Sequence, residues 1–137
     1  MIAIACDHGG YQYKQMLMQH LKDRGIEYKD FGTWSEESCD YPDYARPVAE
    51  AVAAGTYEKG ILICGTGIGM SIAANKVHGI RAAVCGDAFS AKERLGYDLF
   101  FHLHRHQFLV EYFFMSSVLV DQDKRSIWAF HQNIRVK

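Results

Sequence analysis

The chain has 137 residues, 49% of them hydrophobic and 23% charged, which is typical of one globular domain large enough to bury a core. Its formal net charge of −1 provides no basic surface for nucleic acid or anionic lipid, so we expect neither as a partner. No apolar run approaches the roughly 20 residues of a membrane-spanning helix, and the N-terminus lacks the basic region and cleavage pattern of a signal peptide. We therefore expect a single domain over residues 1–137, located in the cytoplasm.

Strand and helix patterns alternate from the N-terminus. A continuous apolar run predicts a strand from Ile2 to Cys6. Side chains at helical spacing predict a helix from Tyr11 to Arg24 that ends before Gly25, and they are Tyr13, Met16, Leu17, His20 and Leu21. A second strand is expected from Glu27 to Phe31 and a polar loop from Gly32 to Asp40.

The alternation continues through the middle of the chain. Pro42 suits the first turn of a helix that runs on from Tyr44 to Ala54, with one apolar face made of Ala45, Val48, Ala49 and Val52. Further elements are expected in this order: a strand Gly60–Cys64, a helix Gly69–Lys76, a strand Ile80–Cys85 and a helix Asp87–Leu95. Alternating strands and helices predict an α/β fold with an open sheet and right-handed crossovers.

The last third of the chain has a weaker pattern. Leu99–Leu103 is a candidate strand, and the strongly apolar run Phe108–Val120 is a candidate for the last helix. Asp121–Lys137 is expected to be a polar tail.

The segment after the third strand carries most of the chemistry. Cys64 ends the strand, and the glycines that follow it, Gly65, Gly67 and Gly69, allow a sharp turn whose backbone N–H groups can point at a ligand. The helix that begins near Met70 places the positive end of its dipole at the same point. A thiol beside amide donors can hold an anion, or take a proton while negative charge develops on oxygen.

Plainer interpretations remain open for these residues. Glycine turns are common, and the spacing matches neither a dinucleotide fingerprint nor a P-loop, because no Gly-Lys-Ser/Thr follows. The cysteines form no C-x-x-C motif, which disfavours a zinc site or a redox dithiol. Cys6, Cys64 and Cys85 each end an apolar run and are most simply small core residues.

Three separate segments are expected at one edge of the sheet. Ligands of open α/β sheets bind beyond the carboxyl ends of the strands. Asp7-His8 and Gly86-Asp87 each follow a predicted strand, and Cys64 ends one. They should therefore converge on one crevice.

Several motifs together resemble the ribose-5-phosphate isomerase B family, which includes the galactose-6-phosphate isomerase subunits. They are Asp7–Gly10, Asp30–Thr33, Asp40–Tyr44, Cys64–Gly69, Ala73–Val77 and Gly79–Ala83. The resemblance covers Met1 to about Lys92. It implies a Rossmann-like three-layer αβα sandwich with a mostly parallel central sheet. It also implies a homodimer, or a dimer of dimers, with active sites at the subunit boundary.

The resemblance implies an aldose–ketose isomerase that moves a proton between C1 and C2 of a sugar phosphate through an enediolate. Cys64 matches the family's base, so activity should rise with the thiolate fraction. The resemblance also implies an anion hole formed by the amides of Gly65, Gly67, Ile68 and Gly69, with hydroxyl donors at Thr66 and Ser71. It implies substrate contacts at Asp7 and His8 and a pocket wall at Tyr41. No metal or organic cofactor is implied.

The chain departs from the family after Lys92. Tyr97 stands where the family has its ring-opening histidine, and Asp98 where it has a substrate-binding asparagine. Ala129-Phe130-His131 replaces two glycines and a first arginine, while Arg135 keeps the second arginine. Ring opening by Tyr97, and substrate binding by Asp98 and Arg135, are expectations that rest on this alignment.

Other roles stay open. Asp7 can cap the first helix and Asn75 can cap a helix end. His102, His104 and His106 would share one face of a strand and could bind a metal, although no carboxylate or Cys ligand accompanies them. The protein could also bind sugar phosphates without turning them over, or act on a six-carbon aldose 6-phosphate rather than ribose 5-phosphate.

Overall fold

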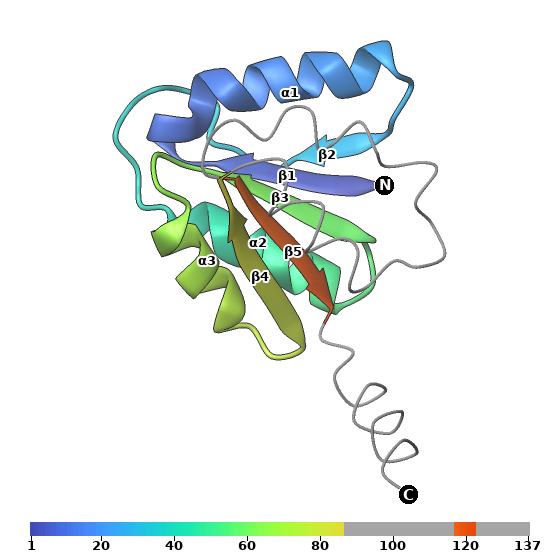
Figure 1. The fold of residues 1–137 in the computed structure, drawn as a ribbon, viewed down its shortest axis with the longest axis vertical. Coiled ribbons are helices and arrows are strands. Elements are labelled where there is room, and N and C mark those ends of the chain that lie inside the picture. The colour runs from blue at the N-terminus through green and yellow to red at the C-terminus, as the bar shows by residue number, and fades with distance from the viewer. Residues whose placement is uncertain (87–116, 123–137) are drawn as a thin grey trace, which may run out of the picture.

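The computed structural model describes residues 1–86 and 117–122, which form a five-stranded sheet between helices. Figure 1 shows α1 along one face of the sheet and α2 and α3 along the other. The elements are β1 (Ile2–Cys6), η1 (His8–Gly10), α1 (Tyr11–Asp23), β2 (Tyr28–Asp30), α2 (Pro42–Ala53), β3 (Lys59–Ile63), α3 (Ile68–Asn75), β4 (Ile80–Cys85) and β5 (Ser117–Gln122). The predicted three-layer α/β fold is confirmed.

The strand order is β2-β1-β3-β5-β4. β1 pairs in parallel with both β2 and β3, whereas β5 runs antiparallel to its neighbours β3 and β4. β4 therefore points the same way as β3, and the sheet is mostly parallel. In the register, Ile63 and Cys85 both lie opposite Ser117, so β3 and β4 end at the same edge.

The strand β5 corrects the prediction for the end of the chain. Ser117–Val120 was expected in a helix, and Asp121 in a polar tail, but all of them belong to β5. Val118, Leu119 and Val120 are buried between β3 and β4. Apolar periodicity alone does not separate a short buried strand from a buried helix, which explains the error. The expected elements Asp87–Leu95 and Leu99–Leu103, and residues 108–116 of the expected helix, lie outside the described residues.

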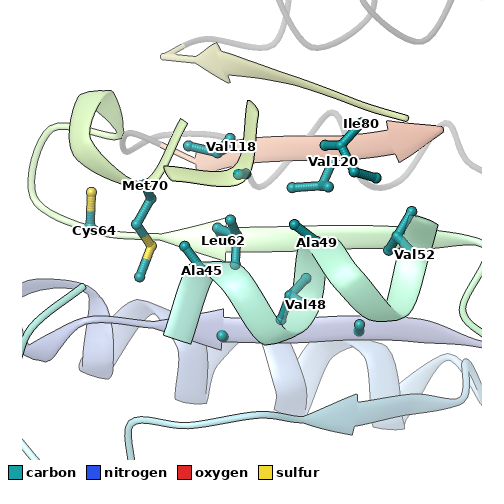
Figure 2. Close-up of a cluster of buried hydrophobic side chains, with 13 residues drawn as sticks. Ala45, Val48, Ala49, Val52, Leu62, Cys64, Met70, Ile80, Val118 and Val120 are labelled. Carbon is teal, nitrogen blue, oxygen red and sulfur yellow. The ribbon is translucent and has the colours of Figure 1, made fainter. Parts of the chain in front are cut away.

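Strands β1 and β3 are buried along their whole length, so their apolar side chains pack on both faces of the sheet. Ala3, Ala5 and Leu62 point toward α2 and α3, and alternate residues of the same strands, such as Ile4 and Ile61, point toward α1. Figure 2 shows the cluster between the sheet and α2. Helix α2 contributes its predicted apolar face to this cluster, namely Ala45, Val48, Ala49 and Val52. Gly60 permits this contact, since a Cβ there would lie 2.6 Å from Val48 Cγ1.

Helix α1 buries only part of the face that the sequence predicted, and Leu17 and Leu21 are the members that pack in the core. Leu21 is buried as expected, but Tyr13 and Met16 are exposed and Lys14 is fully buried. The reason is electrostatic: Lys14 Nζ reaches the carboxylate of Asp30 at 2.6 and 2.8 Å and the carbonyl oxygen of Thr33 at 2.6 Å. A buried ammonium requires such partners, and they fix the rotation of the helix.

The end of α3 is tied to β4 by one side chain. Asn75 Oδ1 accepts a hydrogen bond from the Ala82 amide at 2.8 Å, and its Nδ2 donates to the Ala82 carbonyl oxygen at 2.8 Å and to that of Ser71 at 2.9 Å. The bond to Ser71, four residues earlier, is the helix-end cap that the sequence suggested. Among the described residues, no helix is long and apolar enough to cross a membrane.

Candidate functional site

The predicted convergence of segments at the carboxyl edge of the sheet is confirmed for the described residues. The turn after β1 and the loop after β3 touch: an added Cβ on Gly9 would lie 3.4 Å from the backbone nitrogen of Gly65. Gly10 leaves even less room, because a Cβ there would lie 2.3 Å from the carbonyl oxygen of Ile63. Glycine at both positions therefore lets the two turns pack together. Gly86 follows β4 at the same edge, and Asp87 lies outside the described residues.

Cys64 lies at the end of β3, and only 5% of it is exposed. Its Sγ accepts a hydrogen bond from the backbone N–H of Gly67 at 2.9 Å. Gly67 has φ +74°, a left-handed conformation that turns this amide back toward the sulfur and suits glycine. The loop thus directs a backbone hydrogen-bond donor at the Cys64 sulfur.

The loop amides divide into those used inside the loop and those at the start of α3. Gly67 donates to Cys64, and Ile68 makes a long 3.4 Å contact with Thr66 Oγ1. The first amides of a helix have no intrahelical acceptor, and in α3 these include Gly69 and Met70. The Gly67 amide is thus used inside the loop, and the anion cradle stays a prediction.

The hydroxyl groups of Thr66 and Ser71 take different positions. Thr66 is exposed in the loop and accepts the contact from Ile68, which leaves its own proton to donate. Ser71 Oγ lies 3.4 Å from the carbonyl oxygen of Ala82, on the side of the helix that faces β4. Thr66 is therefore the better placed of the two to meet a ligand at the loop.

Asp7 caps the first turn, as the plainer interpretation of the sequence proposed. Its Oδ1 accepts a hydrogen bond from the Gly10 amide at 3.0 Å, and its backbone N–H donates to the Ile63 carbonyl oxygen at 3.1 Å. The carboxylate is half-buried beside the glycine loop. Capping leaves its other oxygen able to accept a hydrogen bond from a ligand.

His8 comes from the turn after β1, and Tyr41 from the residue before α2. His8 Nδ1 accepts a hydrogen bond from the Cys39 amide at 3.3 Å, and Cys39 Sγ lies 3.8 Å from the same nitrogen. Tyr41 packs over the start of α3, where a Cβ on Gly69 would lie 2.8 to 3.1 Å from three atoms of its ring. Figure 1 shows the loop before α2 reaching the same end of the sheet as α3.

Sequence patterns singled out neither Cys39 nor Lys14, and they placed Asp30 in a motif without predicting its bond to Lys14. Asp30 accepts bonds from both Lys14 and the Gly32 amide, at 2.6 and 2.8 Å respectively. A basic residue on the apolar side of an otherwise amphipathic helix was the one available signal for this pair. No local pattern indicated the contact between Cys39 and His8, which are 31 residues apart.

The remaining predicted site residues are not placed by the structure. Tyr97, Asp98 and Arg135 lie outside the described residues, as do His102, His104 and His106. Within residues 1–86 and 117–122, no cluster of three or more His, Cys, Asp or Glu side chains could hold a metal ion.

Comparisons with known proteins give a consistent result for the first two thirds of the chain. A family model described as Ribose/Galactose Isomerase matches residues 2–96. Ribose-5-phosphate isomerase B of Escherichia coli strain K12 is 57% identical over 91 residues, which are 66% of this chain and 61% of that protein. D-erythrulose-4-phosphate isomerase of Pectobacterium atrosepticum is 44% identical over 92 residues, which are 66% of this chain and 60% of that one.

A solved structure agrees with these relatives. That of ribose-5-phosphate isomerase B from Clostridium thermocellum superposes with a TM-score of 0.68 at 54% identity, and covers 71% of this chain and 66% of that one. The chain spans about three fifths of the length of the two curated relatives, 61% and 60% respectively.

Proposed function

We propose that this chain, which belongs to the ribose/galactose isomerase family, is a sugar-phosphate isomerase that interconverts an aldose phosphate and its ketose. The observation that carries the proposal is the Cys64 thiol at a strand end, held 2.9 Å from the Gly67 amide beside the first turn of α3. This arrangement supplies a candidate base and amide donors for an oxyanion in one place.

The proposed reaction moves one proton between two carbons and a second between their two oxygens. In the open-chain aldose, the Cys64 thiolate takes the proton from C2, and the electron pair of that C–H bond shifts toward the carbonyl to form an enediolate. The resulting thiol returns the proton to C1 while the hydroxyl proton of O2 passes to O1, which yields the ketose. The Gly67 amide stabilises the thiolate, and the first amides of α3 and the Thr66 hydroxyl are placed to stabilise the enediolate oxygens.

The surrounding residues would orient the substrate. In this proposal His8 and Asp7 contact the sugar or its phosphate, since both lie on the turn that packs against Gly65. Tyr41 forms a wall over Gly69. Tyr97 for ring opening, and Asp98 and Arg135 for substrate binding, remain part of the proposal from sequence alone. The proposed assembly is a homodimer.

Ribose 5-phosphate is the default substrate, because the Escherichia coli and Clostridium thermocellum relatives are named for it. The relative from Pectobacterium atrosepticum is named for a four-carbon sugar phosphate, so chain length is the variable that the assay must cover. A six-carbon aldose 6-phosphate belongs in the same panel.

A second candidate is a family member that binds sugar phosphates without turnover. It is favoured by one specific observation: Tyr97 and His131 stand where the resemblance expects a histidine and an arginine.

The decisive experiment measures conversion of ribose 5-phosphate to ribulose 5-phosphate by the full chain, by Cys64→Ala and by Cys64→Ser. Isomerisation by the full chain that disappears in both variants supports the thiolate base. Calorimetric binding of ribulose 5-phosphate with no turnover supports the second candidate. Full turnover by Cys64→Ala excludes Cys64 as the base.

A further inference from the structure

We propose that the Cys39 backbone amide fixes the ring of His8 in the Nε2–H tautomer, so that His8 serves the site as a neutral hydrogen-bond donor. Cys39 is then a positioning residue that acts through His8. The tautomer follows from the geometry alone. Its use in substrate binding rests on the function proposed above.

Two groups of Cys39 approach one nitrogen of the ring. The N–H of Cys39 lies 3.3 Å from His8 Nδ1, and the Cys39 thiol lies 3.8 Å from the same atom. A backbone N–H can only donate, so Nδ1 must be the acceptor. A nitrogen that accepts carries no proton, and in a neutral imidazole the proton is then on Nε2.

The same contact distinguishes the neutral ring from the charged one. In an imidazolium both nitrogens carry protons, and the proton on Nδ1 would point at the Cys39 amide. The contact therefore exists only with the neutral ring, whose Nε2–H can donate to a phosphate or sugar oxygen. The other nitrogen holds the ring in place.

Both partners are held by their own segments. His8 begins η1, and its carbonyl oxygen accepts a hydrogen bond from the Tyr11 amide. Two residues separate Cys39 from Pro42, the first residue of α2, and the Asp43 amide donates to the Asp40 carbonyl oxygen at 3.2 Å. The contact thus joins the turn after β1 to the loop before α2. Cys39 is only partly exposed, whereas His8 is exposed to solvent.

Residue 39 offers a matched pair of variants. Cys39→Ala removes the thiol and keeps the backbone N–H, whereas Cys39→Pro removes both donors. With the histidines ¹⁵N-labelled, and His8 assigned through His8→Gln, long-range ¹H–¹⁵N correlation spectra distinguish a protonated ring nitrogen from an unprotonated one. The full chain and Cys39→Ala should both show His8 with unprotonated Nδ1 and protonated Nε2. Cys39→Pro should shift both nitrogens toward the averaged values of a free imidazole.

The activity readout follows from the same pair. If His8 donates to substrate, Cys39→Pro should raise the KM for ribose 5-phosphate by about tenfold relative to Cys39→Ala, the effect of one hydrogen bond. The corresponding kcat should change less. A mere loss of folding would instead lower the active fraction without changing KM.

The outcomes separate this inference from the proposed function. A proton on Nδ1 of His8 in the full chain overturns the inference, whatever the activity, and needs no variant that might misfold. The expected tautomer in a chain that turns over no sugar phosphate supports the inference and rejects the isomerase proposal. An unaltered His8 spectrum in a folded Cys39→Pro variant would show that Cys39 does not set the tautomer.

Discussion

Lys14 Nζ lies 2.6 Å from Asp30 Oδ1, although the Lys14 side chain is fully buried and the Asp30 side chain is 21% exposed. The ammonium also donates to the Thr33 carbonyl oxygen and lies 5.9 Å from the centre of the Tyr11 ring. A buried charge is tolerated only when such partners replace its hydration. The pair therefore fixes α1 against the end of β2, and with it the beginning of the loop that carries Cys39 and Tyr41.

Breaking this pair should be costly. Lys14→Met keeps the length of the side chain but leaves the Asp30 carboxylate and the Thr33 carbonyl oxygen without their partner, so we expect a loss of roughly 3 kcal/mol in the free energy of unfolding. Urea titration measures it. Lys22→Met, on the exposed side of the same helix, is the control and should change the free energy by less than about 0.5 kcal/mol. Equal effects of the two variants would contradict the structural role of Lys14.

A side chain at residue 69 should be incompatible with the observed position of the Tyr41 ring. A methyl group at residue 69 meets the outer atoms of the Tyr41 ring, which is 40% exposed and can shift, so Gly69→Ala should destabilise the protein by about 1 kcal/mol. Gly65→Ala is the matched control, since a Cβ there meets nothing within 4 Å. Thermal unfolding of both variants gives the comparison.

Removing the ring tests the cause. In the double variant Tyr41→Ala/Gly69→Ala, most of the cost of Gly69→Ala should disappear, because the clash is gone. A double-mutant cycle from the same unfolding measurements gives the coupling between the two residues. Additive effects would mean that Gly69 is needed for another reason.

Burial raises the pKa of the Cys6 thiol from 9.0 to about 12, and the neighbouring Lys14 charge offsets only part of that effect. In the unfolded chain this thiol ionises near its ordinary pKa, whereas the folded protein retains the proton. The contribution of Cys6 to the free energy of unfolding is therefore fully present below about pH 9. It is lost as the pH rises toward 12, and the loss is at most roughly 4 kcal/mol.

Cys6→Ala isolates this contribution. The variant should be less stable than the natural chain at neutral pH because of the lost side-chain volume, but the difference should narrow between pH 9 and pH 11. Urea midpoints of both proteins across that range provide the measurement. Parallel curves would show that Cys6 does not titrate differently in the two states.

Asn75→Ala should loosen β4. The variant loses two bonds to Ala82 and one to Ser71, and we expect a cost of about 1–3 kcal/mol. The amide of Ala82 should exchange its hydrogen much faster, which NMR detects directly. Asn75→Asp keeps the acceptor for the Ala82 amide and should protect it more than Asn75→Ala does. If exchange at Ala82 were the same in all three proteins, the side chain would not hold that amide.

Local patterns predicted much of this fold. The buried runs of β1 and β3 and the apolar face of α2 are simple periodic signals, and they place the ends of β1 and β3 together. The same patterns failed for Lys14, because a charged side chain on a helix is normally assigned to solvent. They failed for β5, because its neighbours β3 and β4 are contributed by distant parts of the chain.

The site shows the same division. The position of Cys64 at a strand end follows from the sequence, as does the turn at Gly67. The bond from Cys39 to His8 does not, because it depends on how the 32–41 loop returns across the sheet edge. The hydrogen bond of Ser71 toward β4 likewise depends on tertiary packing rather than on spacing.

The side chain of Asn75 also has a consequence for self-association. Its amide group bonds to both the N–H and the C=O of Ala82, as a residue of a neighbouring strand would. Ala82 therefore has neither group available to pair with a strand from another molecule, a contact through which exposed sheet edges aggregate. An amide side chain at the end of a helix thus gives β4, an edge strand among residues 1–86 and 117–122, local protection against edge-to-edge growth of the sheet.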